Sequence, residues 1–290
     1  MLTVGVFDGV HRGHQQLIGR AVAEAEKRGV PSVLLTFDPH PAEVVRPGSH
    51  PAQLTTLRRR AELVEELGVD VFCVLPFTPE LSRMPADEFV HEILVERLHV
   101  AEVVVGENFT FGHRAAGDVA LLRRLGSRFG FVADGFGLVS TDSLTYSSTY
   151  IRAAIDAGDV AAASEALGRP HRLEGIIVRG DQRGRELGFP TANLSTPRYA
   201  AVPADGVYAC QFVRRGKPLP AAVSVGSNPT FSGRERRVEA YVLDVDADYY
   251  GENVGLDFVA RLRNMEKFDS TDALRAKMAE DVAATRQLLG

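Results

Sequence analysis

Histidines and glycines gather in one short segment near the start of the sequence. Residues 5–14 read Gly-Val-Phe-Asp-Gly-Val-His-Arg-Gly-His and follow an apolar run. His11 and His14 are three residues apart where a helix is expected to begin, so both side chains can face one side. The amides and the dipole at a helix start favour phosphate, and imidazoles that donate to its oxygens stabilise a leaving pyrophosphate. A pair of surface or capping histidines is the competing interpretation, since so short a motif also occurs by chance.

Two later segments suggest the same chemistry. Residues 106–112 read Gly-Glu-Asn-Phe-Thr-Phe-Gly after an apolar run, which places Asn108 at the end of a strand. Residues 146–152 begin another expected helix, where hydroxyl groups are good caps and an arginine one turn later adds a fixed cation for phosphate. Capping alone also explains the hydroxyls. The polar residues of this helix start are Ser147, Ser148, Thr149 and Arg152.

A glycine-rich segment opens the second half of the chain. Residues 180–193 read Gly-Asp-Gln-Arg-Gly-Arg-Glu-Leu-Gly-Phe-Pro-Thr-Ala-Asn. The glycines allow a close approach to phosphate, but the Gly-Lys-Ser/Thr ending of a Walker loop is missing, so spacing alone favours a plain surface loop. Thr191 and Asn193 flank one alanine, and both offer the oxygen ligands that suit Mg²⁺ held mostly by phosphates and water.

Glu239 stands inside an apolar strand pattern over residues 237–245. Alternation puts Val238, Ala240 and Val242 on one face, and Glu239 lies on the other among further apolar residues. A carboxylate in such surroundings is costly unless it is paired or used. As a general base it would take a proton from a hydroxyl group that attacks ATP. A structural ion pair with Arg236, Arg237 or a loop arginine is the alternative.

The elements that position these groups alternate between two periods in the first half. Strands and helices in alternation predict a parallel sheet covered on both faces, with ligands at the carboxyl ends of the strands. The expected strands are 2–7, 33–37, 69–75, 102–105 and 131–133, and the expected helices are 14–28, 56–67, 86–98, 118–129, 149–157 and 160–167.

The pattern changes near residue 170, where Gly168-Arg169-Pro170 ends the helical period. We therefore expect two domains, 1–169 and 170–290. Short strands without helices between them predict a small antiparallel barrel, and a helix capped by Asp269 or Ser270 closes the chain. The expected strands are 173–178, 207–213, 221–225, 237–245 and 254–262, and Leu274, Met278, Val282 and Leu289 should line one face of the helix.

The composition excludes several classes of protein. A formal net charge of −5 over 290 residues argues against a nucleic-acid binder, and the run Arg58-Arg59-Arg60 is interpreted as a solvated helix face. Cys73 and Cys210 lie in separate apolar runs without metal-ligand spacing, so we expect buried free thiols in a reducing compartment. The sequence shows neither a signal peptide nor the ~18-residue apolar run of a membrane helix, so we expect a cytoplasmic protein without a membrane partner.

Taken together, these segments resemble the bacterial bifunctional riboflavin kinase/FMN adenylyltransferase (FAD synthetase) family. In the first half the resemblance rests on the histidine segment, on Thr-Phe-Asp-Pro-His-Pro at 36–41, and on the segments around Asn108 and Ser147. It implies a Rossmann-like nucleotidyltransferase domain in which His11 and His14 bind the ATP phosphates and act catalytically. The further residues that it implies for ATP or FMN binding are Gly5, Phe7, Asp8, Gly13, Asn108, Ser147, Ser148, Thr149 and Arg152.

The second half resembles the riboflavin kinase module of the same family. The matching segments are 188–193, Gly-Val-Tyr-Ala at 206–209, Ser-Asn-Pro-Thr-Phe at 227–231 and Val-Glu-Ala-Tyr at 238–241. The resemblance implies a six-stranded barrel with a C-terminal helix, and Glu239 as the base that acts on the ribityl hydroxyl of riboflavin. It also implies Mg²⁺ held at Thr191 and Asn193, and ATP bound by Gly180, Gly188, Pro190, Thr191 and Asn193.

The expected function is therefore the synthesis of flavin cofactors from small molecules. The second domain would convert riboflavin and ATP to FMN and ADP with Mg²⁺, and the first would convert FMN and ATP to FAD and pyrophosphate. The FMN phosphate needs no protein base, because its second pKa is about 6. Three alternatives stay open: a chain with only the kinase active, a non-catalytic flavin or nucleotide carrier, and a different nucleotidyltransferase.

Overall fold

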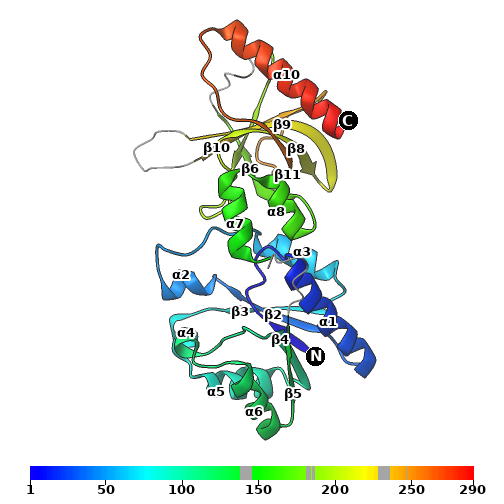
Figure 1. The fold of residues 1–290 in the computed structure, drawn as a ribbon, viewed down its shortest axis with the longest axis vertical. Coiled ribbons are helices and arrows are strands. Elements are labelled where there is room, and N and C mark those ends of the chain that lie inside the picture. Colours follow the sequence, from blue (N-terminus) through cyan, green and yellow to red (C-terminus); the bar gives the residue numbers. More distant parts are fainter. Residues whose placement is uncertain (138–145, 181–183, 185–186, 228–235, 246) are drawn as a thin grey trace. The chain divides into compact units, whose positions relative to one another are not determined.

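The computed structural model describes residues 1–290 except 138–145, 181–183, 185–186, 228–235 and 246. The chain forms two compact units (Figure 1). The first comprises Met1–Pro51 and Thr56–Tyr146, and the second comprises Ala52–Thr55 and Ser147–Gly290. Helices α7 (Ser148–Ala157) and α8 (Val160–Leu167) group with the second unit, so the compact units divide earlier in the chain than the domain boundary predicted after Arg169.

The first unit is built on a five-stranded parallel sheet, as the strand–helix alternation predicts. Its strand order is β3-β2-β1-β4-β5, so the chain leaves β1 toward one edge of the sheet and later returns to its other side at β4. Such a reversal is where open parallel sheets bind ligands, beyond the carboxyl ends of the strands. The strands are β1 (Leu2–Val4), β2 (Val33–Asp38), β3 (Val71–Pro76), β4 (Glu102–Gly106) and β5 (Val132–Phe136).

Helices cover both faces of this sheet. One core cluster packs Leu17 and Ile18 of α1 and Leu63 of α3 with Leu34 and Val104 of the sheet. A second cluster packs η1 and α6 onto the opposite face. The helical segments are α1 (Arg12–Arg28), α2 (Pro41–Val45), α3 (Leu57–Glu65), α4 (Pro79–Arg83), α5 (Ala86–Glu88), η1 (Phe89–Arg97), η2 (His113–Ala115) and α6 (Val119–Phe129).

The prediction that residues 58–60 form a solvated helix face is correct only for Arg58, since the side chain of Arg59 is 14% exposed and that of Arg60 is buried. Arg58 has a side chain that is 62% exposed, whereas the side chain of Arg60 is 7% exposed. The reason is helical geometry. Arg60 lies three and four residues before Leu63 and Val64, which puts all three on the buried stripe of α3.

The second unit contains the predicted antiparallel barrel. Six strands close it in the order β10-β7-β6-β11-β8-β9, and every neighbouring pair is antiparallel. The four-residue strand β7 is too short to stand out as a periodic pattern. The strands are β6 (His171–Val178), β7 (Ala192–Ser195), β8 (Gly206–Arg214), β9 (Lys217–Ser227), β10 (Arg236–Val242) and β11 (Asn253–Arg263).

Alternating side chains fill the barrel. Val238, Ala240 and Val242 of β10 share one face, as predicted, and that face is buried, where they pack with residues such as Tyr208 and Phe258. The strand ends at Val242 rather than at residue 245. Side chains at the intervening positions of β10 point to the outer surface, and this alternation decides which face of the barrel carries the polar groups.

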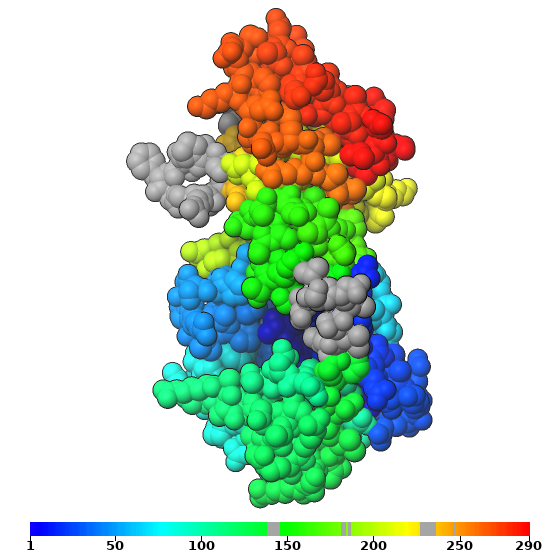
Figure 2. Space-filling view, in the orientation of Figure 1, coloured from blue at the N-terminus to red at the C-terminus, as the bar shows by residue number. Residues whose placement is uncertain are grey.

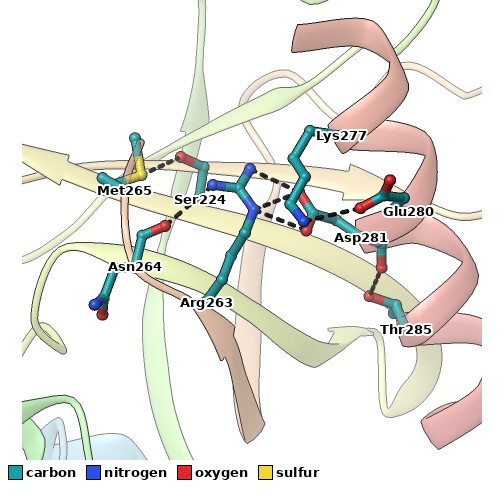
Figure 3. A network of polar contacts seen from close by, with 8 residues as sticks. All are labelled: Ser224, Arg263, Asn264, Met265, Lys277, Glu280, Asp281 and Thr285. Atoms are coloured by element: carbon teal, nitrogen blue, oxygen red, sulfur yellow. Dashed lines mark hydrogen bonds and ion pairs between the residues drawn. The ribbon is translucent and has the colours of Figure 1, made fainter. Parts of the chain in front are cut away.

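Helix α10 (Thr271–Leu289) packs on the outside of the barrel against β8 and β9, and Figure 2 shows it in red at the surface. Ser270 caps the helix, and its most buried residues are Asp281 and Thr285. Arg263, at the end of β11, donates from Nε and Nη2 to the Asp281 carboxylate at 2.9 and 2.8 Å (Figure 3). A two-pronged ion pair therefore supplements the partly buried apolar face as the anchor of this helix.

Both cysteines are free thiols in the structure. Cys210 is fully buried in the barrel, and burial raises the pKa of its thiol well above the usual value. Cys73 is half-buried in β3. Within the described residues, no helix combines the length and the apolar character that crossing a membrane requires.

Candidate functional site

The loop after β1 is tightly turned and strained. Phe7 and Val10 adopt φ values of 52° and 40°, which are unusual for residues other than glycine, and Gly9 between them has φ 84°. Such conformations cost about 1–3 kcal/mol each and persist only where the surroundings hold them. The amide of Val10 donates to the Phe7 carbonyl at 3.1 Å, and Gln15 Nε2 donates to the Val10 carbonyl at 2.8 Å. The loop is thus fastened to the first turn of α1.

His11 and His14 lie face to face at the start of α1. Their ring centroids are 3.6 Å apart with an interplanar angle of 22°, and Phe7 contacts His14 edge-on at 5.2 Å. His11 is the helix cap, because its Nδ1 accepts a hydrogen bond from the His14 amide at 3.3 Å. In the neutral ring the proton is then on Nε2, which makes that atom a donor. The capping role and a phosphate-binding role are therefore compatible, and Gly13 lies between the two histidines in the first turn.

Asp8 is a buried carboxylate with a buried cationic neighbour. It is 2% exposed, and Arg60 Nη2 lies 3.7 Å from its Oδ1. Arg60 Nη1 donates to Thr36 Oγ1 at 3.3 Å. Burial lowers the pKa of the Arg60 guanidinium, and the charges of Asp8 and Asp38 oppose that shift. The sequence interpretation missed Arg60, although its spacing from Leu63 and Val64 could have revealed it.

Asn108 lies at the same edge of the sheet as the loop of residues 5–11 that follows β1, which we call the histidine loop. Strands β1 and β4 are parallel neighbours, so the loops that follow them leave the sheet at the same edge. Asn108 is exposed in the turn after β4, where the Phe109 amide donates to the Gly106 carbonyl at 2.9 Å. A Cβ at Gly106 would lie 3.0 Å from Asn108 Oδ1, so a larger residue there would displace the Asn108 side chain. A Cβ at Gly5 would likewise lie 3.2 Å from the Phe7 ring and press against it.

The four polar residues predicted around 147–152 lie together at the start of α7. Ser147 caps the helix by accepting a hydrogen bond from the Tyr150 amide at 3.2 Å, so the capping interpretation holds for this residue. Ser148 and Thr149 follow in the first turn. Arg152 Nε donates to the Ala52 carbonyl at 2.6 Å. By their contacts these residues group with the second compact unit, whereas His11, His14 and Asn108 belong to the first.

A second group of predicted site residues, Thr191, Asn193 and Glu239, forms a row on the outer surface of the barrel. Thr191 Oγ1 donates to Glu239 Oε2 at 3.2 Å, and Asn193 is the direct cross-strand partner of Glu239 in the pair β7–β10. Arg237 Nη1 lies 3.8 Å from Glu239 Oε1, so the ion-pair interpretation of Glu239 is also correct. Its side chain is 30% exposed and hence open to solvent on one side. Ser224 of β9, which sequence reasoning did not single out, faces Glu239 from the other neighbouring strand.

Two glycines before Thr191, Gly180 and Gly184, lie close to the side chains of Asn193 and Thr191. A Cβ at Gly180 would overlap the Asn193 side chain, and one at Gly184 would overlap the Phe189 carbonyl and lie 3.1 Å from Thr191 Oγ1. Gly188 has φ 86°, a left-handed conformation that favours glycine. Pro190 is exposed just before Thr191. Of the predicted segments, residues 181–183, 185–186 and 228–231 lie outside the described part of the chain.

The described residues contain no group of three or more His, Cys, Asp or Glu side chains arranged to hold a metal ion. The row on the barrel instead offers a hydroxyl, an amide and a carboxylate from Thr191, Asn193 and Glu239. These are hard oxygen donors, and a Mg²⁺ ion takes one or two such protein ligands when phosphates and water complete its octahedron. The residues present thus fit a magnesium ion that arrives with a nucleotide.

Comparisons with known proteins divide the chain in the same order. The family model described as FAD synthetase matches residues 1–150, and the one described as riboflavin kinase matches residues 167–289. The bifunctional riboflavin kinase/FMN adenylyltransferase of Escherichia coli K12 is 36% identical over 100% of this chain and 93% of its own length. The protein of that name from Pseudomonas fluorescens is 38% identical over 99% and 92%. A crystal structure described as a macrolide-efflux protein from Streptococcus pneumoniae is 34% identical with a TM-score of 0.89, over 98% of this chain and 93% of that one.

Proposed function

Because the chain belongs to the bifunctional riboflavin kinase/FMN adenylyltransferase family, we propose that the two constellations described above are the active sites of its two reactions. The enzyme phosphorylates riboflavin to FMN and adenylylates FMN to FAD, with ATP as the second substrate of both steps. We assign the first reaction to the row on the barrel and the second to the histidine loop. We likewise propose that the domains are 1–169 for adenylylation and 170–290 for the kinase.

Glu239 is the general base of the kinase reaction in this proposal. The supporting observation is its partly exposed carboxylate, which accepts a hydrogen bond from Thr191 and faces Asn193 across the strand pair. The carboxylate takes the proton of the ribityl hydroxyl while the oxygen attacks the γ-phosphorus of ATP and ADP leaves.

Thr191 and Asn193 hold the phosphates and the Mg²⁺ ion of the nucleotide. When bound, such an ion neutralises the developing charge on the β- and γ-phosphate oxygens. Gly180, Gly188 and Pro190 contribute to ATP binding in this proposal: Gly180 lies against the Asn193 side chain, and Gly188 has a left-handed conformation that favours glycine.

His11 and His14 stabilise the transition state of adenylylation. The FMN phosphate, already ionised at neutral pH, attacks the α-phosphorus of ATP, and pyrophosphate leaves. The stacked imidazoles and the amino end of α1 stabilise the negative charge that grows on the leaving pyrophosphate. We assign the binding of ATP or FMN to Gly5, Phe7, Asp8, Gly13, Asn108, Ser147, Ser148, Thr149 and Arg152.

The partners of the enzyme are the small molecules riboflavin, FMN and ATP. Since both steps consume ATP, we propose that the protein works in the cytoplasm, where ATP is made. The proposal includes no nucleic-acid or membrane partner.

A chromatographic product assay tests the proposal. The purified protein is incubated with riboflavin, Mg²⁺ and excess ATP, and flavins are separated over time. FMN that appears first and FAD that follows it are the expected result. FMN alone would remove the adenylylation assignment, and neither product from a folded protein would overturn both. Omission of Mg²⁺ with added chelator should abolish FMN formation, and undiminished FMN formation would contradict the metal assignment.

A further inference from the structure

Arg60 is a buried arginine that neither proposed active site uses. Its guanidinium is linked to the histidine loop on both sides of Phe7, directly on one side and through a hydroxyl on the other. On one side it pairs with Asp8, at 3.7 Å. On the other it donates to Thr36 Oγ1 at 3.3 Å, and the Thr36 hydroxyl donates in turn to the Val6 carbonyl at 3.0 Å. One side chain of α3 thus connects to the residues immediately before and immediately after Phe7.

The loop that Arg60 contacts needs such support. Phe7 and Val10 are held at positive φ, and strain of this kind relaxes unless neighbouring groups prevent it. His14 lies against the Phe7 ring, so a shift of Phe7 displaces the imidazole. Rate enhancement by aimed donors depends on geometry, and a misplacement of about 1 Å can cost on the order of 100-fold in rate.

Packing alone does not explain an arginine at this position. Its neighbours on the buried stripe of α3 are Leu63 and Val64, and an apolar side chain suits that environment better. The Nε atom of Arg60 is buried and has no hydrogen-bond partner within the described residues. A buried guanidinium with an unmet donor costs free energy, and an apolar residue of similar volume is often as stable as a buried ion pair.

We propose that Arg60 is a positioning residue of the adenylylation reaction. It holds the histidine loop in its strained conformation through Asp8 and through the Thr36 hydroxyl, and it thereby aims His11 and His14 at the ATP phosphates. Arg60 itself touches no substrate. In this arrangement the buried Asp8 carboxylate, 2% exposed, also links the proposed ligand-binding loop to Arg60. The inference rests on the catalytic role proposed for the two histidines.

The test compares Arg60→Met, Arg60→Lys and the matched control Arg58→Met in the full chain. We expect Arg60→Met to lower kcat for FAD formation from FMN by on the order of 100-fold, with a much smaller change in KM for ATP. Arg60→Lys should lie between Arg60→Met and the wild type, because lysine keeps the charge without the planar fork. Arg58→Met should match the wild type. Riboflavin phosphorylation, measured on the same samples, should be unchanged in all three.

Wild-type kcat for FAD formation in folded Arg60→Met, or an equal loss in Arg58→Met, would overturn the inference. If Arg60→Met unfolds the first unit, Thr36→Val decides, because it removes the hydroxyl link and leaves the ion pair in place. We expect Thr36→Val to lower kcat for FAD formation by about tenfold, and wild-type kcat would overturn the inference.

His14→Ala separates this inference from the proposed function. If that variant forms FAD normally, the catalytic role of the histidines is wrong. If it does not, while Arg60→Met and Thr36→Val form FAD at the wild-type rate, only the positioning role is wrong.

Discussion

Asn193 and Glu239 are direct cross-strand partners in the antiparallel pair formed by β7 and β10. Residues in this relationship have Cβ atoms roughly 4.5–5.5 Å apart, so both side chains serve one site. Ser224 faces Glu239 from β9, so it extends the row of Thr191, Asn193 and Glu239 to the next strand on the outer surface of the barrel. A slip of one residue in register would turn the row into the core, so the apolar interior also maintains the proposed kinase site.

Glu239→Gln should remove riboflavin phosphorylation and spare adenylylation. The amide keeps the shape and the hydrogen bond from Thr191, but it cannot take the proton of the attacking hydroxyl. We expect kcat for FMN formation to fall by about 10²- to 10⁴-fold. FAD formation from added FMN is the internal control and should match the wild type. A variant that still phosphorylates riboflavin at a rate close to the wild type would rule out Glu239 as the base.

His14→Ala should have the opposite effect. Removal of the imidazole leaves the growing charge on pyrophosphate without one donor, so FAD formation should fall by about 10²- to 10³-fold. Riboflavin phosphorylation should not change. Gln16→Ala, an exposed position in the same helix turn, is the matched control for helix effects. Parallel loss of both activities in a folded His14→Ala protein would contradict the division of labour between the two sites.

Asp281→Asn should destabilise the second unit. The substitution leaves the Arg263 guanidinium, 14% exposed, without the opposing charge of Asp281 in the middle of α10. Breaking a buried pair from one side typically costs about 3–5 kcal/mol. Urea unfolding, followed by riboflavin kinase activity, measures the loss. Glu280→Gln is the control, because Glu280 is 67% exposed and its pair with Lys277 contributes at most about 0.5 kcal/mol. Equal midpoints for the two variants would show that the Arg263–Asp281 pair does not anchor the helix.

Asp70 should make the stability of the first unit depend on pH in the acid range. The Ser32 amide and hydroxyl donate to Asp70 Oδ2 at 2.8 and 2.7 Å. These two hydrogen bonds hold the pKa of the Asp70 carboxyl below its usual value, and the bond from the amide has the larger effect. A depressed folded-state pKa contributes stability above the unfolded value of about 3.9, and that stability is lost as pH falls through the folded value.

Urea midpoints measured by circular dichroism from pH 6 to pH 3 test this expectation. The difference between the wild type and Asp70→Asn should be largest at pH 6 and should shrink toward pH 3. A constant difference would mean that the carboxylate contributes through packing, since a charge effect must disappear on protonation.

Local sequence patterns predicted most of the fold correctly. Helix and strand periods gave the parallel sheet, the antiparallel barrel and the closing helix, because those periods report which side of each element is apolar. The same alternation put Val238 and Ala240 on the face opposite Glu239, and the tertiary structure made that face the buried one. The strand β7 escaped this reasoning, since four residues are too few to show a period.

The sequence by itself determined the two folds, their order along the chain and the residue types of both proposed sites, because periodicity and short motifs are local properties. Only the tertiary structure decided which residues face one another. The register of β7, β10 and β9 sets Asn193, Glu239 and Ser224 in one row, and the packing of α3 brings Arg60 to Asp8. Contacts between residues far apart in the chain depend on how elements pack and pair, and no local pattern encodes that choice.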